Sequence, residues 1–402
     1  MIKTRVFILL STFLVVGIFG YFAILLARGY RFDLKTLKFN PNGILVIKSD
    51  PSGAQIFVNG DLRGATDSNI SLAPGTYDVN VKKEGYIPWY KRLTIEKEIV
   101  TEANLSLFKP TPALVPVTFS GVTSPVVSND FSRIAFAVIP NETLEKDKVG
   151  LWVMDTSSLP LGFNRDPKRI TDGNLSGSLW QFSPSAREIL LEIASGVFLL
   201  DTGSFTPQNQ SVNVASKKSL ILSSWEEEKT NKLQAKVKNL PSDFQEILGR
   251  KTYSYVFASD ENKILYSASS SGTLKSKLIP QLPGSSTQKE ERNIIIDHTY
   301  VYDIKEDRNF LVDDGASSLS ITGGNSGGAK RRMFWLSNSH NLVLAEEGKI
   351  TVMDYDGTNR QPVYSGSFLT PYVFSYINSS KLLILTNLGA TSIPNFYSLN
   401  IK

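Results

Sequence analysis

Val6–Ala27 reads VFILLSTFLVVGIFGYFAILLA, a run of 22 residues without a charged side chain. An α-helix rises about 1.5 Å per residue, so this run would be about 33 Å long and would cross a hydrocarbon core of about 30 Å. The sequence after it is mixed in polarity. The chain is therefore predicted to have a short tail at residues 1–5, a membrane-spanning helix at residues 6–27 and a large water-soluble part.

Two other interpretations of this run are a cleaved signal peptide and a buried core helix. The apolar core of a signal peptide spans about 7 to 15 residues and is followed by a small-x-small cleavage site. This run is longer, and it ends in Leu25-Leu26-Ala27-Arg28, which has no clear site of that kind. An uncleaved signal anchor is the favoured interpretation, and the other two stay as alternatives.

The charges on either side of the run give two signals about orientation. Lys3 and Arg5 precede the run, whereas Arg28, Arg31 and further basic residues follow it. A count of flanking cations would keep the long side in the cytoplasm, but a basic segment followed at once by an apolar run is the usual export signal. Large domains also translocate largely regardless of charge. We expect a single-pass protein of a bacterial cytoplasmic membrane, with the soluble part outside the cytoplasm.

Composition excludes several classes of function. Hydrophobic residues make up 41% and charged residues 20% of the chain, which suits packed cores and argues against disorder. The net charge is only +5, and no basic run in the soluble part suggests nucleic-acid binding. The chain has no cysteine and two histidines, so disulfides, thiolate zinc sites, cysteine nucleophiles and His-rich metal sites are excluded. We expect no cofactor.

Strand signals dominate the soluble part, where short runs of Val, Ile, Thr, Tyr and Phe are separated by Gly, Pro, Asn, Asp and Ser. After a predicted juxtamembrane linker at residues 28–42, these signals define a small module at residues 43–108. In it, Asn59-Gly60 is a strong hairpin signal, and residues 77–82 alternate between apolar and polar as in a strand with one buried face. About six short strands are expected, enough for a small β sandwich.

This module resembles the PEGA domain family. The resemblance lies in Pro51-Ser52-Gly53-Ala54, Ile56-Phe57-Val58-Asn59-Gly60, Pro74-Gly75-Thr76-Tyr77 and Lys83-Glu84-Gly85-Tyr86. It covers nearly the whole module, although Ser52 stands where the namesake motif has Glu. PEGA domains are small β-rich modules without known catalysis. The resemblance therefore implies an extracytoplasmic spacer or envelope-binding role and agrees with the orientation expected above.

Tyr86, Trp89 and Tyr90 form an aromatic group directly after a predicted strand. Exposed rings of this kind could stack on a sugar or a peptide, which makes these residues the binding candidates of the module. Aromatic residues also cover small cores and the seams between domains. That second interpretation is favoured.

A larger module is predicted at residues 113–402. Its sequence repeats one pattern: a polar turn, an apolar triplet and, in most copies, a second strand that ends in Asp. The clearest copy has Trp180–Ser185, Ile189–Leu191 and Val197–Asp201. A weaker copy begins at Trp225, and the apolar triplets of the others are Ile134–Phe136, Ile264–Tyr266, Phe310–Val312, Leu342–Leu344 and Leu382–Ile384.

Units of about 40 to 45 residues with four short strands each are the blades of a β-propeller. The soluble part is therefore predicted to be all-β, with a β-propeller of about seven blades, or six or eight as alternatives, after the PEGA-type sandwich. Leu114–Val117 is expected to add a strand to the final blade near Tyr397, which would close the ring. Helical periodicity is scarce, and Ser242–Leu248 is the best helical candidate.

The copies resemble the repeats of TolB-like propellers, in which a Trp-Ser-Pro-Asp-Gly turn precedes an apolar strand and a strand that ends in Asp. Trp180–Leu191 matches that pattern best, and the Asp-Gly pair is lost in most copies. The resemblance implies a platform that binds a protein or another ligand, and no particular reaction.

Two kinds of chemical site have partial sequence signals. Ser-His-Asp hydrolysis would have to use His298 or His340, but no separate α/β domain is expected that could hold its nucleophile turn. Asp354 and Asp356 alternate as the ligands of calcium loops do, but the downstream Glu of an EF-hand loop is missing. These two aspartates are the metal candidates, and an outer hairpin turn is the favoured interpretation.

These features predict a membrane-anchored extracytoplasmic binding or scaffold protein that is not an enzyme. The propeller face would recognise an envelope protein, a peptide or a glycan, and the PEGA module would be a spacer or an envelope-binding module. Two alternatives stay open. One is a structural envelope protein that associates with itself, and the other is a hydrolase with its active site in the propeller channel.

Overall fold

The computed structural model describes residues 2–27, 30–33, 38–142, 144–157, 166–275, 287–315, 319–322, 330–377, 380–388 and 393–402. In residues 2–6, 31–33 and 38–40 it describes the backbone alone. The chain divides into two units: Met1–Leu107 with Gln281–Gln288, and Phe108–Pro280 with Lys289–Lys402.

The first unit begins with helix α1, Ile2–Ala27, which confirms the predicted N-terminal helix and extends it into the predicted tail. Its segment Phe7–Ala27 is long and apolar enough to cross a membrane, and none of it is buried in the protein. A helix that is apolar on every side has no polar face to give to water, so a bilayer suits it. A signal sequence would have the same length and composition.

Two short strands follow, β1 Tyr30–Asp33 and β2 Lys38–Pro41, which pair antiparallel with Tyr30 opposite Pro41. The predicted linker at residues 28–42 therefore contains a small two-stranded sheet. Arg28, one of the cations counted for orientation, lies outside the described residues.

The β sandwich of the first unit consists of two sheets, with strand orders β6-β3-β9 and β5-β4-β7-β8. Alternate side chains from both sheets meet in one core, to which Leu45, Val79 and Trp89 belong. This arrangement confirms the predicted small β sandwich. The strands are β3 Gly43–Asp50, β4 Gln55–Val58, β5 Asp61–Ala65, β6 Ser68–Leu72, β7 Gly75–Lys82, β8 Trp89–Ile95 and β9 Val100–Ser106.

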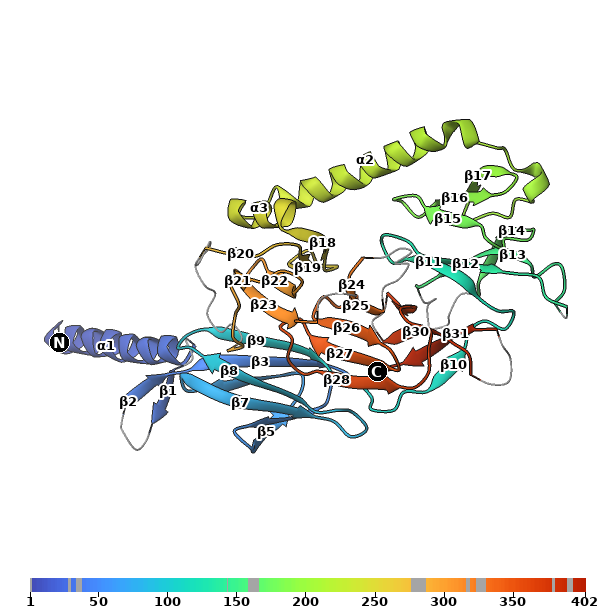
Figure 1. The fold of residues 1–402 in the computed structure, drawn as a ribbon. Helices are drawn as coiled ribbons and strands as arrows, with labels where there is room; N and C mark the ends of the chain where they lie inside the picture. Colours follow the sequence, from blue (N-terminus) through green and yellow to red (C-terminus); the bar gives the residue numbers. More distant parts are fainter. Residues whose placement is uncertain are drawn as a thin grey trace. The chain divides into compact units, whose positions relative to one another are not determined.

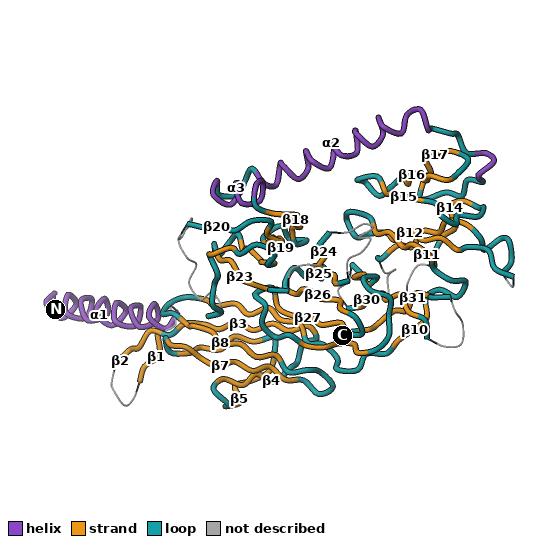
Figure 2. The backbone as a smooth tube through the Cα atoms, viewed as in Figure 1, coloured by secondary structure: helices purple, strands orange, loops and turns teal. Residues whose placement is uncertain are grey.

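The described residues of the second unit contain five sheets of three or more strands, which we name A to E (Figures 1 and 2). Sheet A is β11 Thr123–Val127, β12 Arg133–Val138, β13 Gly150–Asp155 and β14 Lys168–Thr171. Sheet B is β15 Leu179–Phe182, β16 Glu188–Ile193 and β17 Gly196–Asp201. Sheet C is β18 Thr252–Phe257, β19 Lys263–Ala268, β22 Thr299–Asp303 and β23 Arg308–Asp313.

Sheet D is β24 Leu319–Ser320, β25 Arg331–Trp335, β26 Asn341–Glu346, β27 Lys349–Asp354 and β28 Gln361–Ser365. Sheet E is β29 Val373–Ser375, β30 Lys381–Thr386, β31 Asn395–Asn400 and β10 Leu114–Pro116. A two-stranded sheet of β20 Gly272–Thr273 and β21 Asn293–Ile294 accompanies them.

Sheet E joins the two ends of the unit. Its strand β10, from the start of the unit, pairs antiparallel with β31, from the end, and Pro116 lies opposite Tyr397. This pairing confirms the strand that the sequence predicted at Leu114–Val117. It covers the outer edge of β31, which would otherwise present unpaired backbone groups.

Shared cores show that the five sheets pack face to face in the order C, D, E, A, B. The residues that meet include Leu265 and Met333 (C with D), Val343 and Leu382 (D with E), Phe396 and Phe136 (E with A), and Ala135 and Ile189 (A with B). Each sheet thus buries its faces against its neighbours, as propeller blades do. The second unit is therefore of the predicted β-propeller class.

Helices, and not another sheet, cover the two faces at the ends of this series. Helix α2, Lys218–Val237, packs on sheet B, where Trp225 joins a small core with Leu190 and Val197. Helix α3, Ser242–Arg250, packs on sheet C, where the ring of Phe244 stacks on that of Tyr302 with centroids 3.9 Å apart.

The C-terminal end of α2 also touches sheet C, because Lys236 pairs with Glu261 at 2.8 Å. In Figure 1, α2 accordingly runs from the region of β15–β17 to α3 beside β18. A helical segment therefore stands between B and C, where a further blade would close the ring. Of this segment the sequence predicted α3, which is confirmed, but not α2.

This arrangement corrects three of the predicted repeats. The copy placed at Trp225 is wrong, because that residue lies in α2. The triplets Ile264–Tyr266 and Phe310–Val312, taken as separate copies, belong to one sheet, C. The described part of the chain has five blade-like sheets, so the number of about seven is not confirmed.

The packing of α3 leads to a prediction about stability. Phe244 is 0% exposed, so Phe244→Ala is expected to lower the free energy of unfolding by about 3–5 kcal/mol through the lost contacts and the cavity left behind. The control Leu220→Ala, on the exposed side of α2 at 71% exposure, should change it by less than about 0.5 kcal/mol. Urea unfolding of the detergent-solubilised chain measures both. Equal effects would contradict the packing described for α3.

Candidate functional site

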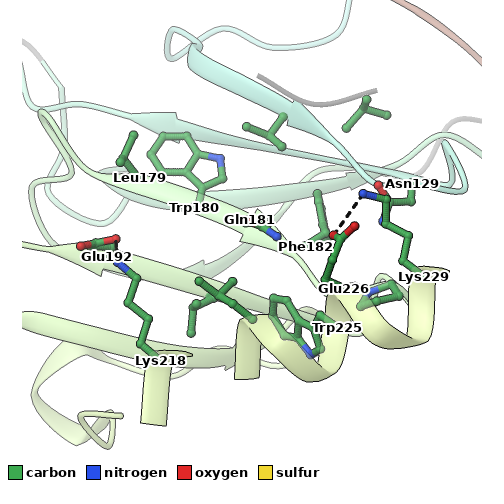
Figure 3. A pocket seen from close by; sticks show the side chains of 15 residues that line it. Asn129, Leu179, Trp180, Gln181, Phe182, Glu192, Lys218, Trp225, Glu226 and Lys229 are labelled. Carbon is green, nitrogen blue, oxygen red and sulfur yellow. Dashed lines mark hydrogen bonds and ion pairs between the residues drawn. The ribbon is translucent and has the colours of Figure 1, made fainter. Parts of the chain in front are cut away.

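A cavity of about 480 Å³ lies in the second unit beside strand β15, a volume typical of ligand-binding pockets (Figure 3). Strand β11 and the turn after it form one wall, and α2 forms the opposite wall. The lining residues are Val126, Val127, Asn129, Leu179, Trp180, Gln181, Phe182, Pro184, Leu190, Glu192, Lys218, Leu222, Trp225, Glu226 and Lys229.

The cavity exists because α2 covers only part of the outer face of sheet B. Cross-strand partners share a face, and Gln181 lies opposite Leu190. Trp225 packs over Leu190 on the central strand, but Leu179 and Gln181 on β15 stay exposed, Leu179 at 60%. A neighbouring sheet would have covered all three strands. The helix leaves the β15 side of the face open.

Strand β15 also has a free edge, because β16 is its only partner in the described part of the chain. Ser183 N donates a hydrogen bond to Glu188 O at 2.9 Å. In an antiparallel pair every second residue bonds to the partner strand, so this bond shows which residues of β15 bond to β16. Leu179 and Gln181 therefore bond to β16, while Trp180 and Phe182 direct their N–H and C=O groups to the free edge. No described group bonds to these four backbone groups.

The charged side chains of the lining form two ion pairs. Lys218 Nζ lies 2.6 Å from Glu192 Oε2, and Lys229 Nζ lies 3.3 Å from Glu226 Oε2. All four side chains are at least one-third exposed, so each pair contributes little to stability. Because the two pairs balance, the wall of the cavity carries no net charge. Among the described residues, the lining has no serine, threonine, histidine or tyrosine that could act as a nucleophile or base beside these carboxylates.

The aromatic rings of the lining are buried in the protein. Trp180, Phe182 and Trp225 are 6%, 5% and 9% exposed. Trp180 and Phe182 belong to the core between sheets A and B, and the indole N–H of Trp180 has no hydrogen-bond partner among the described residues. No ring therefore offers the open face on which a sugar would stack.

The three aromatic candidates of the first unit do not form one surface. Trp89 is 3% exposed in the core, and Tyr86 packs against the same core. Tyr90, the next residue along β8 from Trp89, points to the other side and is 48% exposed. There it lies beside Asp78, whose pKa is held at about 2 chiefly by the hydrogen bond from Arg92.

Of the two metal candidates, Asp354 is the last residue of β27 and Asp356 lies in the turn after it. Asp354 accepts hydrogen bonds from the side chains of Asn341, 3.1 Å, and Asn359, 2.9 Å. Asp356 accepts two from Thr358, at 3.2 Å from N and 2.6 Å from Oγ1. The turn thus uses these carboxylates for its own closure. Among the described residues, no group of three His, Asp or Glu side chains could hold a metal ion.

The sequence indicated none of the residues that line the cavity as a site. Trp180 and Trp225 were singled out, but as parts of repeats. The signal that could have found the site is a polar helical stretch, residues 226–236, between two blade patterns. Such a stretch interrupts the repeats and so leaves the adjoining sheet without its next blade.

Arg332, on β25, is a buried cation outside the cavity, and a buried cation could hold an anion. It is 3% exposed, its guanidinium lies 5.3 Å and 4.9 Å from the ring centres of Phe334 and Phe374, and Nη1 donates to Val373 O at 3.2 Å. Burial lowers the pKa of Arg332 to about 10, and Nε has no described partner. Two aromatic rings therefore hold this cation in place, and it does not line the cavity.

Substitution by methionine should lower the free energy of unfolding at one of the two neighbouring arginines of β25 and not at the other. Arg331 pairs with Asp313 at 2.6 Å, and Asp313 is 5% exposed, so Arg331→Met should cost about 1–3 kcal/mol by leaving that carboxylate unpaired. Arg332→Met removes a buried charge without a carboxylate partner and should leave the free energy of unfolding unchanged or higher. Urea unfolding of both variants tests this. A loss in Arg332→Met as large as in Arg331→Met would be the contradicting result.

Comparison with known proteins gives one family match, since the PEGA domain model matches residues 42–110. This range holds the β sandwich of the first unit and confirms the resemblance found in its sequence. No curated protein matches the chain.

The solved structures with similar folds include TolB and other propeller proteins. TolB from Acinetobacter baumannii is 11% identical with a TM-score of 0.22, and the match covers 81% of this chain and 59% of that one. A luciferin-regenerating enzyme is 13% identical with a TM-score of 0.24, covering 72% and 97%.

The propeller domain of the Trilobed protease from Pyrococcus furiosus, which has an open velcro topology, is 14% identical with a TM-score of 0.20, covering 81% and 92%. At these TM-scores the propeller class of the second unit depends on the packing of its own sheets. The established family likeness of this chain is that of residues 42–110 to the PEGA domain.

Proposed function

We propose that this protein is anchored in the cytoplasmic membrane by α1 and binds another envelope protein, outside the cytoplasm, in the cavity beside β15. The observation that carries the proposal is the half-covered face of sheet B, where Leu179 and Gln181 stay exposed next to a cavity of about 480 Å³. A concave site that combines apolar side chains with a few polar groups is typical of recognition sites.

The lining favours binding over catalysis. Its carboxylates, Glu192 and Glu226, each pair with a lysine, and it has no hydroxyl, thiol or imidazole group to join them. The two histidines lie elsewhere, with Nδ1 of His298 near Ile296 O at 3.0 Å and Nδ1 of His340 near Asn338 O at 2.5 Å. A hydrolytic site would need converging acid and base groups.

The lining also favours a protein ligand over a glycan. Glycans are usually held by the exposed faces of aromatic rings, whereas Trp180 and Trp225 are 6% and 9% exposed. The exposed side chain of Leu179 and the free backbone groups of β15 suit a polypeptide better.

The other parts of the chain take supporting roles in this proposal. Residues 6–27 would be the membrane anchor, residues 28–42 a short connection, residues 43–108 a PEGA-type spacer or envelope-binding module, and residues 113–402 the binding unit. The match to the PEGA domain supports the extracytoplasmic side, because it agrees with the export signal at the N-terminus.

A photoreactive amino acid at position 181 tests the proposal in cells that express the full chain. Gln181 is exposed and lines the cavity, so cross-linking there should yield an adduct with another envelope protein. The same amino acid at Glu347, exposed in the turn between β26 and β27, is the control and should not yield this adduct. Equal adducts from both positions, or none from 181, would refute binding in the cavity. An adduct only between two copies of the chain would favour self-association instead.

A further inference from the structure

We infer that the ligand of this cavity is an extended polypeptide segment that adds to sheet B as a new strand alongside β15. The inference rests on the proposed function, because it names the class of ligand that the same cavity would take. Strand addition needs a free sheet edge, room beside it and walls that suit the added side chains.

The free edge is provided by Trp180 and Phe182. Their N–H and C=O groups, four in all, point away from β16 and have no partner among the described residues. Both side chains are buried, Trp180 at 6% and Phe182 at 5% exposure, which fixes this part of the backbone in place. Another extended backbone, with N–H and C=O groups at the same spacing, is the ligand that pairs all four groups at once.

The room beside the edge is the cavity, which continues onto the face of β15 that α2 leaves open. In a closed propeller, the next blade would stand against sheet B along its whole face. Here α2 packs on Leu190 of β16 and Val197 of β17, and the cavity takes up the remaining space beside β15.

The walls set the character of the side chains. Successive residues of an added strand would point alternately toward β11, where Val126 and Val127 line the cavity, and toward α2, where Leu222 and Trp225 line it. Both sets would meet apolar groups. The ion pairs Lys218–Glu192 and Lys229–Glu226 balance each other, so the segment needs no net charge. The inferred ligand is a short stretch of another protein, rich in β-branched residues and nearly neutral.

The test uses a synthetic probe of no net charge, the fluorescent peptide acetyl-Lys-Val-Thr-Val-Thr-Val-Glu-amide, with the full chain in detergent micelles. Two further versions carry N-methyl groups, one on the three valines and one on the two threonines. In a paired strand, alternate N–H groups face β15 and the others face away. One methylated version should therefore bind at least about tenfold more weakly than the parent peptide, while the affinity of the other version should stay close to that of the parent.

Protein variants locate the binding. Gln181→Arg places a large charged side chain in the cavity and should lower the affinity for the parent peptide by about tenfold or more. Glu347→Arg, at an exposed turn, should leave that affinity unchanged. Strand addition would be overturned if both methylated versions lost affinity equally, if neither lost affinity, or if the parent peptide did not bind.

The outcomes separate this inference from the function proposed above. An envelope protein that cross-links from position 181, together with peptides that do not bind or do not discriminate, would leave the proposed function standing and overturn strand addition. Peptides that bind with the expected asymmetry, in a protein that gives no cross-link in cells, would support the strand site and remove the proposed envelope partner.

Discussion

A propeller blade buries its two faces only against other sheets, and this constraint organises the second unit. The central strands of sheets A to E carry apolar side chains on both faces, so each sheet needs a neighbour on either side. Sheets C, D, E, A and B pack against one another in that order. The face of B and the face of C at the two ends of the series are left, and α2 and α3 cover them. Trp225 and Phe244 are the anchors of this cover.

The helical cover differs from a blade in one respect that matters for function. A blade is a sheet as broad as its neighbour, whereas a helix is about 10 Å across and presents one narrow stripe of side chains. Helix α2 therefore covers β16 and β17 and leaves the face of β15 exposed, next to the edge that has no partner strand in the described part of the chain. The cavity is a direct consequence of covering a sheet with a helix.

The sequence predicted the parts of this fold that depend on short-range patterns. The apolar run of α1, the alternation of the PEGA-type strands and the apolar triplets of the blades are all local signals, and so is the strand at Leu114–Val117 that pairs with β31. The sequence did not predict α2, because the middle of this helix is polar on all sides and has no periodic apolar face to reveal it. The misassigned copy at Trp225 has the same cause, since a single tryptophan in a polar stretch fits a repeat as well as a helix.

The candidate site was harder to predict than the fold. Tyr86, Trp89, Tyr90, Asp354 and Asp356 stood out as residue types, and the structure places them in a core, on a strand surface or in the closure of a turn. The cavity depends on which strand lacks a neighbour, a long-range property that no single residue carries. Leu179 and Gln181 are ordinary strand residues in the sequence, and only the position of α2 leaves them exposed.

Amide hydrogen exchange along β15 in the full-length protein tests the central claim most directly, namely that this strand has an unpaired edge next to the face that α2 leaves open. The account predicts that the amides of Trp180 and Phe182 exchange fast, while that of Gln181, bonded to β16, exchanges slowly. Equal, strong protection of all three amides would show that another strand covers the edge and would contradict the account.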